Sequence, residues 1–253
     1  MKSWPYLAVH CLQYAQGEFA FEFSIVPLRE NVSCVLQSRD SPREQENHLL
    51  VLERIALSLL HVTTFEQCVA WARALYDEYL WRIEDTLLEH PEDEIDNGVQ
   101  FWSPPRRLPC AREYAFNWDD EDCKCFVKAA AILKAKTCGV ALPQEGDIHI
   151  DTRWLHSQNQ PLFSQHSERK KLMSRRANRL QAQEDTAVDA DSAAEAEEIR
   201  RLVSIAAAAP PDNTHIQPIY FNKDDPVHMC FTSAILHILI FQPFRAMQRF
   251  VIV

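Results

Sequence analysis

Glycine is scarce in this chain of 253 residues, which holds only Gly17, Gly98, Gly139 and Gly146. Average usage of roughly 7% would give several times as many. Loops that bind phosphate through the backbone need glycine, and neither the GxGxxG nor the GxxxxGK[ST] pattern occurs in the sequence. Nucleotide binding through either kind of loop is therefore excluded for these residues.

Basic charge and long apolar runs are also in short supply. Lys and Arg number 26 against 36 Asp and Glu, a net charge of −10, so we do not expect nucleic acid to bind through bulk charge. The most apolar stretch, 235–241, is interrupted by His237 and is much shorter than the about 20 residues that cross a bilayer. No adequate apolar signal segment opens the chain. We therefore expect neither a nucleic-acid partner nor a membrane.

The eight cysteines are dispersed along the chain, which is unlike a small disulfide-rich scaffold. We expect free thiols in a reducing cytoplasmic or nuclear compartment. Zinc is a weaker hypothesis for Cys110, Cys123, Cys125 and Cys138, because a Cys-x-Cys spacing at a helix start directs the two thiols apart. Free thiols, buried or at the surface, are the preferred interpretation.

Hydrophobic spacing predicts a mainly α fold with short β or irregular segments. Apolar positions recur at helical intervals near 6–23 and from 49 to 60. The clearest helix follows Thr64, which forms a capping box with Gln67, and it ends before Pro91. Residues 31–47 have the composition of a loop.

A second clear helix is expected from Asp120 to Gly139, with the glycine just past the helix end. The chain between the two helices is Pro-rich and irregular, with an apolar anchor at Phe101 and Trp102. Residues 148–150 are a candidate short strand.

The sequence contains one internal repeat. Phe-Asn-Trp-Asp-Asp at 116–120, followed by Cys-Phe at 125–126, matches Phe-Asn-Lys-Asp-Asp at 221–225, followed by Cys-Phe at 230–231. In both copies the acids precede an expected helix, where the helix dipole favours negative charge. We therefore predict two helices with similar caps and similar buried faces.

Charge segregates in the second half of the chain. Six basic residues lie between Arg169 and Arg179, and seven acidic residues lie between Glu184 and Glu198. Such a pattern is typical of a solvated helix pair or a mobile insertion, and it offers few large apolar residues to offset chain entropy. We predict a charged, loosely packed insertion at 164–212; a nuclear signal or an RNA patch is the less favoured alternative.

No constellation of residues identifies an active site. Three groups have the chemistry of a nucleophile, a base or a ligand: His10 with Cys11, His149 with His156, and His228 with Asp224 and Asp225. Adjacent helix residues project about 100° apart, which separates the first pair. Helix capping explains the acids of the third group. We therefore assign no catalytic, cofactor-binding or metal-binding residue to this chain.

Several segments, in order, resemble the second catalytic-cysteine half-domain of the large ubiquitin-activating enzyme. Residues 10–15 are similar to the family's His-Thr-Leu-Gln-Trp-Ala, and 65–72 resemble Trp-x-x-Cys-Val-x-Trp-Ala. Phe-Trp-Ser-Pro-Pro-Arg-Arg at 101–107 is the most specific match, to Phe-Trp-Ser-Gly-Pro-Lys-Arg. Residues 221–231 are similar to the Phe-Glu-Lys-Asp-Asp segment with its histidine. The resemblance runs from residue 2 to about 234.

The resemblance implies a reaction that needs more domains than this chain is expected to contain. The family uses ATP and magnesium to adenylate the carboxyl terminus of ubiquitin or a ubiquitin-like modifier. It then forms a thioester on a cysteine and transfers the modifier to a conjugating enzyme. The resemblance places that cysteine two residues before Met1, so we expect a fragment without the nucleophile or the adenylation domains. Alternatives are a non-catalytic interaction module of the ubiquitin pathway and the product of a truncated gene.

The resemblance and the composition divide the chain into four parts. The helical part of the half-domain covers 1–163, the charged insertion 164–212 and a segment returning toward the adenylation domain 213–234. The tail at 235–253 matches nothing in the family. We expect residues 232–253 not to pack as the family's continuing helix does, which would leave Phe241, Phe244, Phe250 and the terminal Val-Ile-Val exposed. Deletion of the residues after Ala234 is therefore expected to improve solubility.

Overall fold

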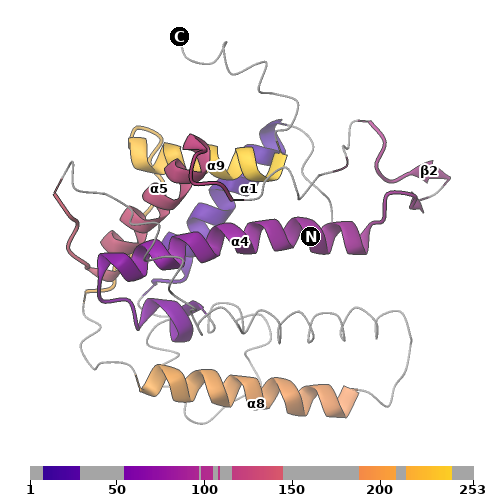
Figure 1. The fold of residues 1–253 in the computed structure, drawn as a ribbon. Helices are drawn as coiled ribbons and strands as arrows, with labels where there is room; N and C mark the ends of the chain where they lie inside the picture. Colours follow the sequence, from indigo (N-terminus) through magenta and orange to yellow (C-terminus); the bar gives the residue numbers. More distant parts are fainter. Residues whose placement is uncertain are drawn as a thin grey trace.

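The computed structural model in Figure 1 is mainly helical, as the sequence predicted. It describes residues 8–28, 54–96, 98–104, 108, 116–144, 188–208 and 215–240. The elements are α1 (Ala8–Phe19), η1 (Ala20–Ile25), η2 (Ile55–Leu59), α4 (Phe65–Glu89), β1 (Ile95–Asp96), β2 (Val99–Gln100), α5 (Glu121–Cys138), α8 (Val188–Ala207) and α9 (Pro226–Ile240). The expected loop at 31–47 and strand at 148–150 lie outside the described residues. In the described part of the chain, no helix has both the length and the apolar character needed to span a membrane.

The helix α4 forms the middle layer of the molecule. Its 25 residues extend about 37 Å, with α5, α9 and α1 on one side and α8 on the other (Figure 1). The capping box is confirmed: Thr64 Oγ1 accepts from the Gln67 backbone N–H at 3.3 Å, and Gln67 Oε1 accepts from the Thr64 backbone N–H at 3.2 Å. The helix ends at His90, directly before Pro91, as predicted.

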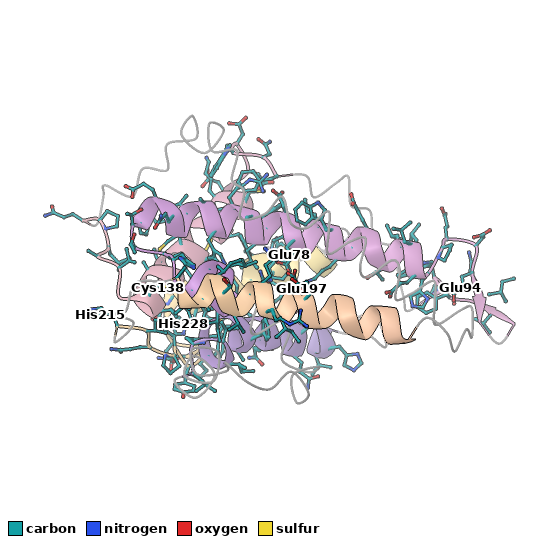
Figure 2. The ribbon with its side chains drawn as sticks, turned by 90° about the horizontal axis from the view of Figure 1, so that it is seen from below. Glu78, Glu94, Cys138, Glu197, His215 and His228 are labelled. Atoms are coloured by element: carbon teal, nitrogen blue, oxygen red, sulfur yellow. A yellow bond between two sulfur atoms is a disulfide. The ribbon has the colours of Figure 1, made fainter. Side chains whose placement is uncertain are left out.

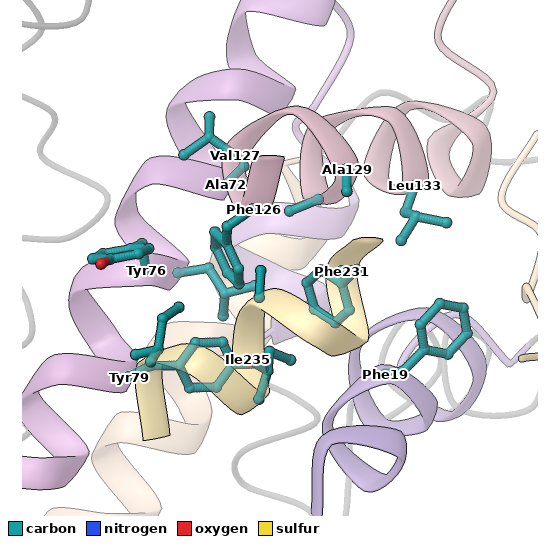
Figure 3. Close-up of a cluster of buried hydrophobic side chains, with 14 of the residues drawn as sticks. Phe19, Ala72, Tyr76, Tyr79, Phe126, Val127, Ala129, Leu133, Phe231 and Ile235 are labelled. Atoms are coloured by element: carbon teal, nitrogen blue, oxygen red, sulfur yellow. The ribbon is translucent and has the colours of Figure 1, made fainter. Parts of the chain in front are cut away.

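An aromatic cluster fills the space between α1, η1, α4, α5 and α9 (Figure 3). The Phe231 ring lies 5.4 Å from Phe126, 5.1 Å from Phe23 and 6.0 Å from Phe19, measured between ring centroids. Most of these contacts are edge-to-face, a geometry that contributes about 0.5–1.5 kcal/mol per pair beyond area burial. The cluster therefore joins helices that are far apart in the sequence into one core.

The two copies of the internal repeat form the same cap, which confirms the prediction. The side-chain oxygens of Asn117 and Asn222 each accept from the backbone N–H two residues later, at 2.9 and 3.0 Å. Asp120 and Asp225 then each accept from the N–H groups two and three residues later, at 2.8 and 3.4 Å in both copies. These carboxylates satisfy otherwise unpaired donors at the starts of α5 and α9.

Gly139 ends α5 in the left-handed conformation, with φ 68°, as its predicted position requires. A Cβ at this position would lie 2.5 Å from His215 Cβ, whereas a Cβ at Gly17 would meet nothing within 4 Å. We expect Gly139→Ala to lower the free energy of unfolding by about 1–3 kcal/mol. Gly17→Ala, within α1, is expected to raise it by about 0.5–1 kcal/mol. Urea denaturation of both variants measures the contrast, and equal effects would contradict it.

The prediction that 164–212 is loosely packed is wrong for α8. Three apolar residues on one face of its second half, Ile199, Leu202 and Ala206, are buried. They pack against Val26, Ile55 and Leu59. The acidic residues concentrate before this stripe, so overall composition concealed a short amphipathic segment. The rest of the segment lies outside the described residues.

The expectation for the tail is also wrong in part. The helix α9 continues to Ile240, and Ile235 and Ile238 are buried in the main core. Burial of such side chains stabilises a core by about 1.5–3 kcal/mol each. Removal of residues after Ala234 is therefore expected to weaken the fold, whereas the sequence alone favoured an improvement in solubility.

The Pro-rich region after α4 begins with a short hairpin that the sequence did not predict. The strands β1 and β2 are antiparallel, with Ile95 opposite Gln100. Gly98 adopts φ 79° in the turn, a conformation that glycine adopts without steric cost. Phe101 and Trp102 are buried against the end of α4, which confirms the predicted apolar anchor.

Candidate functional site

The cysteines considered for zinc do not come together. Cys123 and Cys138 lie at opposite ends of α5, about 22 Å apart along the helix. Cys125 is bonded to Cys230, and Cys110 lies outside the described residues. Among the residues that the structure describes, no three His, Cys, Asp or Glu side chains are grouped so as to hold a metal ion.

The expectation of free thiols is wrong for Cys125 and Cys230, which form a disulfide between α5 and α9. The two residues occupy equivalent positions in the repeat, 105 residues apart, and their Cα atoms are separated by 6.4 Å, within the usual range for a disulfide. The next residues, Phe126 and Phe231, stack on each other. The repeats therefore pack like the two halves of a two-fold interface, in which equivalent residues meet.

The thiols that the structure shows as free are poor nucleophiles. Cys11, Cys68 and Cys123 are buried, and Cys138 is half-buried. Burial raises the pKa of Cys11 and raises that of Cys68 to about 12. The reactive species is the thiolate, which burial disfavours. Cys11 beside half-exposed His10 therefore lacks the environment of a catalytic thiol.

His228 has a structural position in the first turn of α9. Its Nδ1 accepts from the Asn222 N–H at 3.0 Å, and its Nε2 lies 3.6 Å from the Asp225 carboxylate. The ring also packs against Phe19. Asp225 caps α9, which confirms the capping interpretation, and exposed Asp224 pairs with Lys223. His149 and His156 lie outside the described residues.

Acid is expected to destabilise the fold through His228. Burial lowers its pKa from the ordinary 6.5, although Asp225 opposes the shift. The unfolded chain therefore binds the proton first, so stability is lost as the pH falls below 6.5 toward the folded-state pKa. We expect His228→Gln to flatten this decline between about pH 7 and pH 5, measured by urea denaturation. His10→Gln is the control; an unchanged decline in His228→Gln would contradict the assignment.

A buried charge network is the main polar feature that the sequence analysis missed. Arg54 Nε lies 3.1 Å from Glu22 Oε1, and Arg54 Nη2 lies 2.5 Å from Glu78 Oε2. All three side chains are buried, and Glu78 projects from α4 into the interior (Figure 2). Burial alone would lower the pKa of Arg54, but Glu22 and Glu78 raise it. Arg54 therefore stays charged and joins η1, η2 and α4.

The network continues along α4 and onto α5. Arg82 pairs with Glu18 and Glu78, each at 2.8 Å. On the other side, Lys134 donates to Ser58 Oγ at 3.3 Å and lies 4.4 Å from the centre of the Trp71 ring. The six charged members of the buried charge network are Glu18, Glu22, Arg54, Glu78, Arg82 and Lys134, so its three acids balance its three bases.

The geometry of this network is that of a structural core. Five of its six charges form ion pairs with one another, whereas buried Lys134 donates to Ser58 and lies over the Trp71 ring. Burial raises the pKa of Glu22, and the positive charge of Arg54, which pairs with this carboxylate, opposes the shift. The i,i+4 pairs Glu18/Glu22 and Glu78/Arg82 were a signal in the sequence, but no local pattern connected them to Arg54.

These observations define a mainly helical protein whose core is held by internal ion pairs and aromatic packing. Residues 5–237 match the sequence profile of the family described as "Ubiquitin-activating enzyme, SCCH domain". The chain belongs to this family, so the resemblance found in the sequence is confirmed.

Full-length relatives support the same assignment. The chain is 27% identical over 247 residues to ubiquitin-activating enzyme E1 1 of Triticum aestivum, covering 88% of this chain and 22% of the relative. It is 30% identical over 248 residues to ubiquitin-activating enzyme E1 1 of Schizosaccharomyces pombe (92% and 23%). It is 29% identical over 252 residues to human ubiquitin-like modifier-activating enzyme 1 (92% and 22%). The chain thus spans about a fifth of the length of the curated relatives it matches.

Proposed function

We propose that this chain is the helical part of the half-domain that carries and shields the catalytic cysteine of a ubiquitin-activating enzyme. The family match over residues 5–237 is the observation that carries the proposal. In the whole enzyme, the carboxyl terminus of ubiquitin or a ubiquitin-like modifier is adenylated, transferred to a cysteine as a thioester and passed to a conjugating enzyme. The ATP and magnesium of that reaction bind outside this chain, which lacks both glycine-rich phosphate loops.

The described residues contribute a stable helical core that supports the segment with the catalytic cysteine, and they do not supply the nucleophile. An acyl transfer needs a thiolate within about 3–3.5 Å of the acyl carbon, with the leaving group aligned. Cys11 and Cys68 are buried thiols with raised pKa values and do not fulfil this requirement. The core that joins α1, α4, α5 and α9 instead supplies a fixed surface beside the segment that bears the nucleophile.

We propose the cytoplasm, the nucleus or both as the location of this function. Thiols are mostly reduced there, so Cys125 and Cys230 would be in exchange between the thiol and disulfide states. The helical core does not depend on the disulfide alone, because Phe126 and Phe231 stack beside it.

The activity of the isolated chain tests the proposal that these residues support the catalytic cysteine and do not themselves form the thioester. We mix the purified chain with ubiquitin, ATP and magnesium and separate the products on a non-reducing gel. No reductant-sensitive adduct is expected, because the described cysteines are buried, half-buried or disulfide-bonded. An adduct that disappears in Cys11→Ala would overturn the proposal and show that the chain is an enzyme by itself.

A further inference from the structure

The hairpin tip, defined as residues 88–96 and 98–100, carries aliphatic side chains into solvent. It consists of the last two residues of α4 and the hairpin that follows, and it projects beyond the helical bundle (Figure 1). Leu88 and Ile95 are each 70% exposed, and Val99 is 61% exposed. Single exposed aliphatic residues are common on protein surfaces, but here three lie within one projecting surface element with most of their area in water.

This surface is held rigidly. The His90 ring stacks on Phe101 at 3.9 Å with an interplanar angle of 7°, and the indole Nε1 of Trp102 donates to the His90 carbonyl at 2.7 Å. The Phe101 N–H donates to the Glu94 carbonyl at 2.9 Å. Because these bonds already order the hairpin, a partner that binds it loses little free energy in fixing its shape.

Each face of the hairpin carries one aliphatic side chain beside a polar residue. Ile95 is opposite Gln100 and Val99 is opposite Asp96 in the antiparallel pair. Side chains alternate between the faces of a strand, so Ile95 and Val99 lie on opposite faces. A partner that covers both must follow the hairpin around its edge, which suits an extended segment better than a flat surface.

The surroundings of the tip are strongly acidic. Residues 84–96 contain seven acids and no Lys or Arg. Glu84, Glu89, Glu92 and Asp93 are exposed and have no basic partner among the described residues. A second copy that met the first tip to tip would bring acid against acid, and an anionic nucleic acid or lipid surface would be repelled for the same reason.

We propose that the hairpin tip docks an extended, basic segment of another protein that carries aliphatic side chains between its Lys or Arg residues. The aliphatic side chains cover Ile95 and Val99, and the basic side chains pair with Glu92 and Asp93. This inference concerns a surface of the described residues and stands apart from the role proposed for the half-domain.

A short fluorescent peptide of alternating lysine and leucine is the probe, titrated into the full chain and followed by anisotropy. Ile95→Ser with Val99→Ser is expected to weaken binding about ten-fold, since aliphatic burial is lost. Glu92→Gln with Asp93→Asn is expected to weaken it about five-fold at about 20 mM salt, and the difference shrinks at about 300 mM. These side chains are exposed, so the variants keep the fold, which circular dichroism checks.

The matched control is Glu66→Gln with Asp119→Asn, which removes two exposed acids distant from the hairpin tip. It is expected to change binding less than two-fold. An equal loss in this control would overturn the proposal in favour of non-specific charge attraction. A serine-for-leucine peptide that binds equally well would also overturn it. So would dimers of the chain in sedimentation that Ile95→Ser with Val99→Ser dissolves, because the occupant would then be a second copy.

Discussion

Arg54→Met is expected to lower the free energy of unfolding by about 3–5 kcal/mol. The change leaves buried Glu22 without its cation and removes one of the two bases that contact Glu78. An unpaired buried charge is strongly destabilising because the protein interior cannot replace the water around it. Urea denaturation followed by circular dichroism measures the loss.

Two further variants separate this effect from a general loss of arginine. Arg200→Met removes an exposed arginine that pairs with Glu197 within α8, and it is expected to change stability by less than about 0.5 kcal/mol. Glu22→Gln combined with Arg54→Met is expected to recover part of the loss, because the uncompensated charge is gone. If Arg54→Met and Arg200→Met are equally stable, the network does not brace the core.

Reduction of the Cys125–Cys230 disulfide is expected to lower the free energy of unfolding by about 4–5 kcal/mol. The bond spans 105 residues, and a closed loop of this length removes about that much chain entropy from the unfolded state. For a chain of this size the melting temperature should fall by roughly 10 °C or more. Scanning calorimetry with and without a phosphine reductant gives the shift.

The variant Cys125→Ser with Cys230→Ser provides the control. It is expected to melt near the temperature of the reduced protein and to be insensitive to the reductant, since Cys11, Cys68, Cys123 and Cys138 are free thiols already. If the reductant lowers the melting temperature of the control as much as that of the parent chain, or does not lower that of the parent chain, the disulfide does not stabilise the fold.

Local signals predicted the ends of the helices well. The Thr64 cap of α4, the Asp120 cap and Gly139 end of α5, and the matching cap at Asp225 depend on residues within one turn, which a sequence displays directly. The repeat even paired Cys125 with Cys230 in alignment. The disulfide between these equivalent residues was nevertheless not predicted. It forms only because the two repeats pack on each other, and the sequence does not show that packing.

Contacts between elements that are distant in the sequence could not be predicted from such local signals. Arg54 meets Glu22 and Glu78 only because three separate elements converge, and no periodicity encodes that convergence. The packing of α8 was missed because the seven acids between Glu184 and Glu198 dominate the local composition and conceal an apolar face of about two turns. The predicted domain boundaries at 163 and 212 stay predictions.

The central claim is that residues 5–237 fold and work as the half-domain of a ubiquitin-activating enzyme. The most direct measurement replaces the matching segment of the Schizosaccharomyces pombe relative, to which this chain is 30% identical, with residues 5–237. The chimaera is mixed with ubiquitin, ATP and magnesium and run on a non-reducing gel. A reductant-sensitive ubiquitin adduct is expected. A chimaera that folds and forms the ubiquitin adenylate, but no adduct, would contradict the central claim.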